Sequence, residues 1–203
     1  MSLEVAIVPT GTANLASVVA GMRRAGATPT TVSDADQVAR AERVVVPGVG
    51  AFGAAMATID RMGMRTALRE RVIEGRPTLA VCVGMQLLCS TSEESPAHTG
   101  LGVIAGRLTR FAGDVRVPQL GWNQVEPELG MRFLTDGWAY FANSYRMDHI
   151  PEGWTGAMSD HGGAFVAGLE RGDVLACQFH PELSGHWGEA VLSAWLSATE
   201  GAR

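Results

Sequence analysis

The sequence predicts an α/β fold in which a mostly parallel sheet is flanked by helices and an antiparallel β section is added in the C-terminal half. Up to about residue 90, short apolar segments of strand type alternate with segments of helical periodicity, an order typical of right-handed βαβ units. From residue 101 to residue 178, strand signals separated by turn residues dominate. The length suits one domain, which we place over residues 1–203.

The first half of the chain is predicted to contain four strands. They are expected at residues 3–8, 28–32, 43–46 and 79–81. The third of them is almost wholly β-branched, so it is expected to be buried on both faces. Helices are expected to begin after Asn14, a candidate N-cap, and after Ser33, which opens a pattern resembling a capping box. Another helical pattern, over residues 56–73, is expected to continue through Gly63.

The second half is predicted to be mainly antiparallel sheet. Its strands are expected at residues 102–111, 115–117, 121–125, 138–147, 155–159, 164–169 and 174–178. The polar, turn-rich segment 91–99 is expected to be a surface loop. A helix is predicted over residues 185–198, where apolar side chains recur along one side.

Charge and residue usage exclude several classes of function. The net charge of −5 provides no basic surface, so we expect neither nucleic acid nor a membrane as a partner. All 16 positive residues are arginine, which excludes Schiff-base and P-loop chemistry because both need a lysine amine. The sequence shows no signal peptide and no membrane-spanning apolar run, and its three cysteines form no C-x-x-C pattern. We therefore expect a cytoplasmic protein.

Metal binding is not expected. Of the five histidines, only His180 and His186 are close in sequence, and no H-E-x-x-H pattern or Cys/His cluster accompanies them. We predict neither a metal site nor a cofactor.

The segment around Cys82 has the pattern of a nucleophile elbow. A buried strand is expected to end at this cysteine, and a helical pattern follows at once. Ala80 and Gly84, two positions before and after it, fit the sharp turn that lifts such a side chain above the edge of a sheet. The helix dipole at this position would favour the thiolate. The alternative is that Cys82 is a small buried core residue.

A candidate base and acid follow a later strand, in His180-Pro181-Glu182. The carboxyl ends of parallel strands meet at one edge of a sheet, so these side chains are expected to lie near Cys82. In an extended segment His180 and Glu182, two apart, would point the same way. A cysteine nucleophile needs a base, and the base needs a carboxylate to orient it. The alternative for His180 is a solvent-facing side chain beside a chance acid.

The loop Pro47-Gly48-Val49-Gly50 follows the third predicted strand. Its backbone N–H groups at Val49 and Gly50, with that of Val83, are expected to form an oxyanion hole. A phosphate-binding loop and an ordinary tight turn are the alternatives. Because glycine stands on both sides of Val49, a peptide flip costs little there. We hypothesise that partner or ligand binding turns one N–H into the hole.

Several motifs together resemble one enzyme family. Val81-Cys82-Val83-Gly84-Met85-Gln86-Leu87 with Gln178-Phe179-His180-Pro181-Glu182 resembles the signature of class I (triad-type) glutamine amidotransferases. Five further motifs resemble, more narrowly, the glutaminase subunits of imidazole glycerol phosphate synthases: Asn14-Leu15-Ala16-Ser17-Val18, Pro47-Gly48-Val49-Gly50-Ala51-Phe52, Pro118-Gln119-Leu120-Gly121-Trp122-Asn123, Tyr140-Phe141-Ala142-Asn143-Ser144-Tyr145 and His180-Pro181-Glu182-Leu183-Ser184-Gly185. The similarity extends along essentially the whole chain.

The resemblance implies a fold and a reaction. The fold would be the flavodoxin-like α/β fold of class I glutamine amidotransferases. Cys82, His180 and Glu182 would form the triad that hydrolyses L-glutamine to glutamate and ammonia. The ammonia would pass to a (β/α)8-barrel cyclase subunit in a heterodimer, which makes imidazole glycerol phosphate and aminoimidazole carboxamide ribotide in histidine biosynthesis. No cofactor is implied.

The resemblance also assigns residues to the substrate and the partner. Gln86, Ser144 and Tyr145 would hold glutamine, with core packing or turn hydrogen bonding as the alternative. The residues implied at the partner interface or the ammonia tunnel are Trp122, Asn123, Tyr140, Asn143 and Leu183. Leu183 stands where the family has a lysine, and Asn143 where it usually has a histidine. We therefore expect catalysis to be kept and coupling to the partner to be tuned differently.

Two other functions stay open on the sequence. One is a glutaminase subunit of another ammonia-using synthase, against which Gly121-Trp122-Asn123 and residues 140–145 argue. The other is a non-catalytic flavodoxin-like binding protein with a structural Cys82. The intact set of cysteine, histidine and glutamate argues against it.

Overall fold

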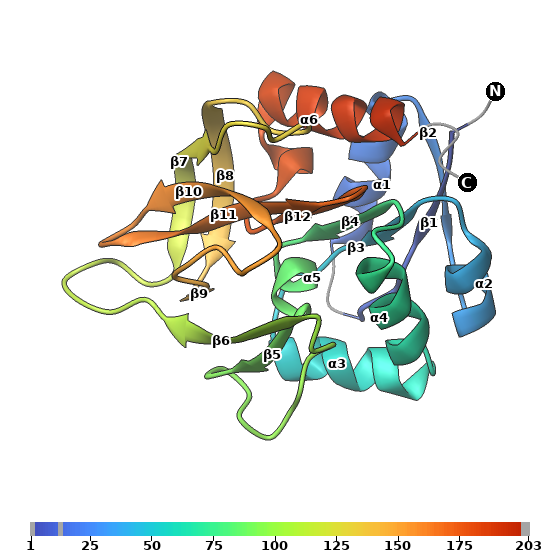
Figure 1. Cartoon of the computed structure of the whole chain (residues 1–203), viewed down its shortest axis with the longest axis horizontal. Helices are drawn as coiled ribbons and strands as arrows, with labels where there is room; N and C mark the ends of the chain where they lie inside the picture. The colour runs from blue at the N-terminus through green and yellow to red at the C-terminus, as the bar shows by residue number, and fades with distance from the viewer. Residues whose placement is uncertain (1–2, 12–13, 200–203) are drawn as a thin grey trace.

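A nine-stranded mixed sheet organises the computed structural model, which describes residues 3–11 and 14–199 (Figure 1). The predicted domain, 1–203, thus includes eight residues outside the described part: 1, 2, 12, 13 and 200–203. In chain order the elements are β1 (Leu3–Ile7), α1 (Leu15–Arg24), β2 (Ala27–Thr31), α2 (Ala35–Arg40), β3 (Val44–Val46), α3 (Phe52–Arg61), α4 (Arg65–Ile73), β4 (Thr78–Val81), α5 (Val83–Gln86), β5 (Cys89–Ser92), β6 (Ile104–Arg110), β7 (Gln119–Pro127), β8 (Gly137–Asn143), β9 (Tyr145–Arg146), β10 (Thr155–Asp160), β11 (Ala164–Arg171), β12 (Val174–Cys177), the short 3-10 helix η1 (Pro181–Leu183) and α6 (Gly185–Ala198).

The sheet confirms the predicted division into parallel and antiparallel parts. Its order is β2-β1-β3-β4-β12-β11-β10-β7-β8. The first five strands are parallel neighbours, and from β12 to β8 every pairing is antiparallel. β4 and β12 lie side by side with Val81 opposite Cys177, so the segments that follow these two strands leave the sheet at the same edge.

Helices cover both faces of the parallel part. Figure 1 shows α1 and α6 together on one side of the sheet and α2, α3 and α4 on the other. The core between these layers is aliphatic and aromatic: β3 is fully buried along Val44–Val46, as its β-branched sequence predicts, and Trp195 of α6 is completely enclosed. Asn14 caps α1 by accepting a hydrogen bond from the Ser17 N–H, and Asp34 caps α2 through the Gln37 N–H.

The helix predicted over residues 56–73 is wrong as a single element. The structure contains two helices, α3 and α4, separated at Gly63. Gly63 has a φ of +67°, which ends α3 in the left-handed conformation that glycine adopts at little cost. The apolar periodicity continues through the break, because both helices pack on the same face of the sheet.

Three predictions in the second half also need correction. Residues 115–117 form no strand but a bent loop between β6 and β7. The predicted loop 91–99 begins inside a strand, because β5 extends to Ser92 and pairs with β6. The predicted strand 138–147 is divided at Ser144 into β8 and β9, which pair with different strands.

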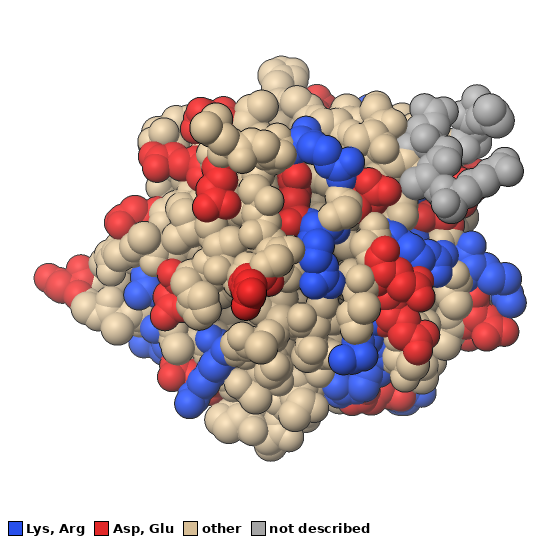
Figure 2. All heavy atoms as spheres, in the orientation of Figure 1, with Lys and Arg blue, Asp and Glu red and all other residues tan. Residues whose placement is uncertain are grey.

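Charged side chains are mixed on the visible surface. Figure 2 shows arginines and acidic residues interspersed across one face of the molecule. Within the described residues, no helix is both long enough and apolar enough to cross a bilayer.

Candidate active site

Cys82 occupies a strained turn between β4 and α5. Its φ of 53° and ψ of −109° make it the one non-glycine residue of the described chain with a positive φ. Such a conformation costs roughly 1–3 kcal/mol and persists only where the surroundings enforce it. Here α5 lies so close to β3 that a Cβ on Gly84 would collide with the Val46 carbonyl oxygen. The elbow predicted from the sequence is therefore present in its backbone geometry.

The structure brings His180 and Glu182 together beneath the same sheet edge. Nδ1 of His180 donates to Oε1 of Glu182 at 2.9 Å, and the two side chains are only 2% and 6% exposed. The sequence predicts that His180 and Glu182 point the same way because they are two apart in an extended segment. In the structure, however, Glu182 does not continue an extended strand. It lies in the 3-10 turn η1, Pro181–Leu183, and this turn carries its carboxylate back to the imidazole.

The charge state of His180 is set by its two partners. Burial alone would lower the pKa of His180, but interactions with the Cys82 side chain and with Glu182 outweigh burial and raise the pKa to about 10. The second ring nitrogen, Nε2, has no hydrogen-bond partner although it is buried. The raised pKa favours the protonated form of His180, whose Nε2 can then donate a proton toward the Cys82 side chain.

A cavity of about 410 Å³ opens beside the Cys82 side chain. Its lining residues are Gly50, Ala51, Cys82, Val83, Gln86, Glu94, Pro118, Leu120, Ala142, Asn143, Ser144 and Tyr145. The three predicted substrate residues Gln86, Ser144 and Tyr145 are among them. Glu94, which the sequence did not single out, is the one carboxylate of this lining; it lies in a turn-rich stretch that gave no motif.

The predicted oxyanion hole is only partly arranged. Gly50 and Val83 line the cavity, whereas Val49 does not. The Val83 N–H donates to the Gly48 carbonyl oxygen at 3.2 Å, so one of the expected donors is engaged within the chain. The far end of the loop is held by Glu94, whose Oε2 accepts from the Phe52 N–H at 2.6 Å.

Gln86 lines the cavity, and its amide nitrogen forms hydrogen bonds within the chain. It is 4% exposed, and its Nε2 donates to the Tyr145 carbonyl oxygen at 3.3 Å and to Oε1 of Gln178 at 2.9 Å. The amide nitrogen of Gln86 thus has the structural hydrogen-bonding role that was the alternative to substrate binding.

An exposed apolar surface lies next to the cavity. It consists of Leu120, Trp122, Trp138 and Leu183, each between 43% and 57% exposed, and we call it the aromatic surface. Tyr140 packs edge-on against Trp122 with ring centroids 6.3 Å apart. Contiguous exposed apolar side chains of this kind mark interaction sites.

The predicted partner residues divide into two groups. Trp122, Tyr140 and Leu183 contribute to the aromatic surface. Leu120 and Trp138 were not predicted; they lie two positions from Trp122 on β7 and from Tyr140 on β8, and so share the same face of these strands. Asn143 instead is 4% exposed and lines the cavity. Asn123 binds the backbone of a neighbouring strand, since its Nδ2 donates to the Asp160 carbonyl oxygen at 2.6 Å.

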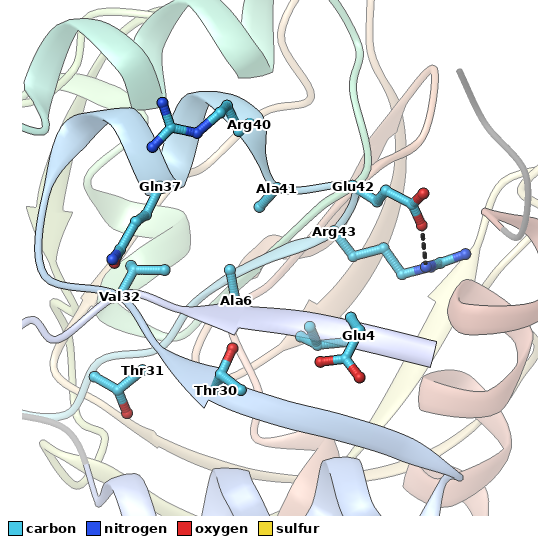
Figure 3. A pocket seen from close by; sticks show the side chains of 11 residues that line it. Glu4, Ala6, Thr30, Thr31, Val32, Gln37, Arg40, Ala41, Glu42 and Arg43 are labelled. Carbon is cyan, nitrogen blue, oxygen red and sulfur yellow. Dashed lines mark hydrogen bonds and ion pairs between the residues drawn. The ribbon is translucent and has the colours of Figure 1, made fainter. Parts of the chain in front are cut away.

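A second cavity, of about 450 Å³, lies between α2 and strands β1 and β2 (Figure 3). Its polar side chains do not converge: in Figure 3 those of Arg40 and Glu42 point in different directions, and Arg43 pairs with Glu42 at 3.2 Å. None of its described lining residues is a cysteine, serine or histidine. In the part of the chain that the structure describes, no group of three or more His, Cys, Asp or Glu residues is placed to hold a metal ion.

Comparisons with known proteins identify the family of the chain. The family profile described as "Glutamine amidotransferase class-I" matches residues 10–196. The chain is 38% identical over 196 residues to imidazole glycerol phosphate synthase subunit HisH of Symbiobacterium thermophilum, covering 95% of this chain and 92% of that protein. It is 37% identical over 193 residues to imidazole glycerol phosphate synthase hisHF, chloroplastic, of Arabidopsis thaliana. That match covers 92% of this chain and 33% of the Arabidopsis protein. A solved structure described as a glutamine amidotransferase matches with a TM-score of 0.76 at 21% identity, over 97% of this chain and 98% of that one.

The mixed sheet, the cysteine elbow and the buried His–Glu pair are the features of a class I glutamine amidotransferase. The chain belongs to that family and, within it, to the HisH subunits of imidazole glycerol phosphate synthase, with which it shares 34–39% identity.

Proposed function

We propose that this chain is the glutaminase subunit of an imidazole glycerol phosphate synthase. It hydrolyses L-glutamine at Cys82 and delivers the ammonia to a (β/α)8-barrel cyclase subunit in histidine biosynthesis. The observation that carries the proposal is the strained Cys82 beside the buried His180–Glu182 pair at a cavity of about 410 Å³. The names of the relatives supply the pathway and the existence of a partner subunit.

The first half of the reaction forms a thioester. The Cys82 thiolate attacks the side-chain amide carbon of glutamine, and negative charge develops on the amide oxygen. Backbone N–H groups of Val83 and of the Val49-Gly50 segment stabilise that oxyanion. The Nε2 proton of His180 passes to the departing nitrogen, so ammonia leaves and an acyl-enzyme remains.

The second half releases glutamate. Neutral His180 takes a proton from water through Nε2, and the resulting hydroxide adds to the thioester carbon. The tetrahedral intermediate collapses with the carbon–sulfur bond breaking, which restores the Cys82 thiolate beside a protonated His180. Glu182 keeps Nδ1 protonated throughout and stabilises the imidazolium.

Glu94 is suited to bind the α-ammonium group of the substrate. It is the one carboxylate among the lining residues of the cavity, and the substrate carries one positive charge. Ser144 and Tyr145 line the same cavity and contribute the polar groups that orient the rest of the amino acid.

The proposed oxyanion hole requires a rearrangement. Because the Val83 N–H donates to the Gly48 carbonyl oxygen, this donor becomes available only when the loop Pro47-Gly48-Val49-Gly50 shifts. We propose that partner or ligand binding favours the shifted loop, with the glycines on both sides of Val49 allowing the change.

The aromatic surface is the proposed docking site of the cyclase. Leu120 belongs both to this surface and to the lining of the cavity, so a partner that covers the surface also covers the exit from the site. Ammonia released at Cys82 would then enter the partner without meeting bulk water. We place the protein in the cytoplasm, where its three free thiols stay reduced, and treat residues 1–203 as one domain.

One experiment tests the reaction and the coupling together. Glutamate release from glutamine is measured for wild type, Cys82→Ala and the matched control Cys89→Ala, each alone and with a candidate cyclase. Cys89 is buried outside the cavity lining, so its variant should retain activity. The proposal is supported if Cys82→Ala loses glutamate release, Cys89→Ala keeps it, and the cyclase stimulates release by the wild type. Equal release by the wild type and both variants would sink it.

A further inference from the structure

The sulfur of Cys82 accepts a side-chain hydrogen bond from a residue other than His180 and Glu182. Nε2 of Gln178 lies 3.7 Å from the Cys82 Sγ and donates a hydrogen bond to it. Gln178 is only 1% exposed, and it directly follows β12, the parallel neighbour of β4. Its amide therefore approaches the sulfur from within the protein, and Gln178 is not among the residues that line the cavity.

The orientation of this amide is fixed by its neighbours. Gln86 uses its Nε2 hydrogens on the Tyr145 carbonyl oxygen and on Oε1 of Gln178. Since Oε1 of Gln178 must accept from Gln86, only Nε2 of Gln178 is left to face the sulfur. The chain of donors thus runs in one direction and ends at Cys82.

We propose that Gln178 is a further catalytic residue, whose side-chain amide donates a hydrogen bond to the Cys82 thiolate and stabilises it before attack on the substrate. The inference rests on the proposed role of Cys82 as nucleophile. Hydrogen bonds to an ionised acceptor are roughly twice as strong as those between neutral groups. The donor therefore favours the thiolate over the thiol.

The protonated thiol has a different partner. The Ala142 carbonyl oxygen lies 4.0 Å from Sγ and can accept a hydrogen bond from the thiol but not from the thiolate. In the thiolate the stabilising groups are Gln178 and the His180 imidazolium. Gln178 is neutral and cannot take up the proton, so its contribution does not depend on the state of His180.

Two variants separate this role from a structural one. Gln178→Glu keeps the size and the oxygen that accepts from Gln86 but places an acceptor against the sulfur. Gln178→Met keeps the length and removes both hydrogen bonds. The matched control is Gln124→Met, since Gln124 is an exposed glutamine of β7. A residue that only fills the core would leave the ionisation of Cys82 unchanged.

The measurement is the rate of Cys82 alkylation by iodoacetamide between pH 5 and 10, read by mass-spectrometric sequencing. Cys89 and Cys177 do not compete, because burial raises the pKa of Cys89 to about 12 and that of Cys177 well above its ordinary value. Both Gln178 variants should be alkylated about tenfold more slowly at pH 7, with the midpoint moved up by about one pH unit. The control should match wild type.

An unchanged midpoint in folded Gln178 variants would overturn the inference. If circular dichroism shows that the variants do not fold, the wild-type side-chain amide resonances of Gln178 decide: they must shift as Cys82 titrates, and constant resonances overturn it. Failure of the proposed function looks different, because Cys82→Ala would then keep glutaminase activity. If the pH midpoint of Cys82 alkylation is unchanged in the Gln178 variants but alkylation still abolishes glutaminase activity, only the role of Gln178 is refuted.

Discussion

The backbone N–H of Cys82 donates to the carbonyl oxygen of Cys177 at 2.6 Å. This bond continues the parallel pairing of β4 and β12 by one residue, so the turn that carries the thiol is fixed to the strand that leads to His180. The chain segments that carry Cys82 and His180 therefore follow two adjacent, hydrogen-bonded strands of the sheet. Sites built on such elements are held more accurately than sites on loops.

Replacing Glu182 should remove one of the two side chains that raise the pKa of His180; the other, Cys82, stays in place. In Glu182→Gln we therefore expect the pKa of His180 to fall below about 10. Glutaminase turnover should fall roughly 10⁴-fold, the size of the loss when the orienting carboxylate of a triad is replaced. Histidine resonances followed by NMR across pH 5 to 11 report the pKa, and glutamate release reports turnover.

The same shift predicts how stability depends on pH. Because the folded-state pKa of His180 is raised, its contribution to the free energy of unfolding is fully present below pH 6.5 and is lost as pH rises through about 10. Glu182→Gln should lose part of this dependence, because the Cys82 side chain also raises the pKa of His180. Glu189→Gln is the matched control, since Glu189 pairs with the exposed His186. Parallel pH profiles for wild type and Glu182→Gln in urea unfolding would contradict this account.

Glu94→Gln should weaken substrate binding more than chemistry. The amide keeps an oxygen for the Phe52 N–H but loses the charge proposed to pair with the substrate α-ammonium group. We expect KM for glutamine to rise about 10- to 100-fold, the equivalent of one charged hydrogen bond, with a smaller change in kcat.

Steady-state glutaminase kinetics check this expectation. The matched control is Glu93→Gln, whose carboxylate pairs with Arg107 and does not line the cavity. A fall in kcat at unchanged KM would assign Glu94 to the loop and not to the substrate.

Gly84→Ala should disrupt the elbow. The new Cβ would collide with the backbone carbonyl of Val46, so the strand and helix must move apart, at a cost of about 1–3 kcal/mol in stability and with loss of activity. Thermal unfolding and glutamate release measure both effects. Gly106→Ala is the control, because its nearest atom would be 3.9 Å away; equal stability of the two variants would refute the steric argument.

Trp122→Ala and Trp138→Ala should each weaken binding of the cyclase. Large aromatic side chains at the centre of an interface typically contribute 2 kcal/mol or more, so the dissociation constant should rise about 30-fold or more. Surface plasmon resonance with a candidate cyclase measures it. Leu129→Ala is the control, since Leu129 is fully exposed in the connection between β7 and β8; an equal loss of affinity for all three would show that the aromatic surface is not the docking site.

The sequence by itself determined much of the fold and the reacting groups. The alternation of short apolar strands with helical periods predicts the parallel sheet, and the β-branched β3 is buried along its whole length. The elbow at Cys82 and the pair of His180 and Glu182 could also be predicted from the sequence. Both are signalled by residues within a few positions of one another in the chain.

Only the tertiary structure decided how these groups meet. Glu94 enters the cavity from a loop without a motif, and Gln178 reaches the sulfur because β12 lies beside β4. Asn143 turns inward while Leu120 and Trp138 turn outward, since strand pairing fixes which face of β7 and β8 meets the core. The Gly48 carbonyl oxygen takes the Val83 N–H. Each of these contacts joins residues far apart in the chain or depends on side-chain direction, and local sequence patterns specify neither.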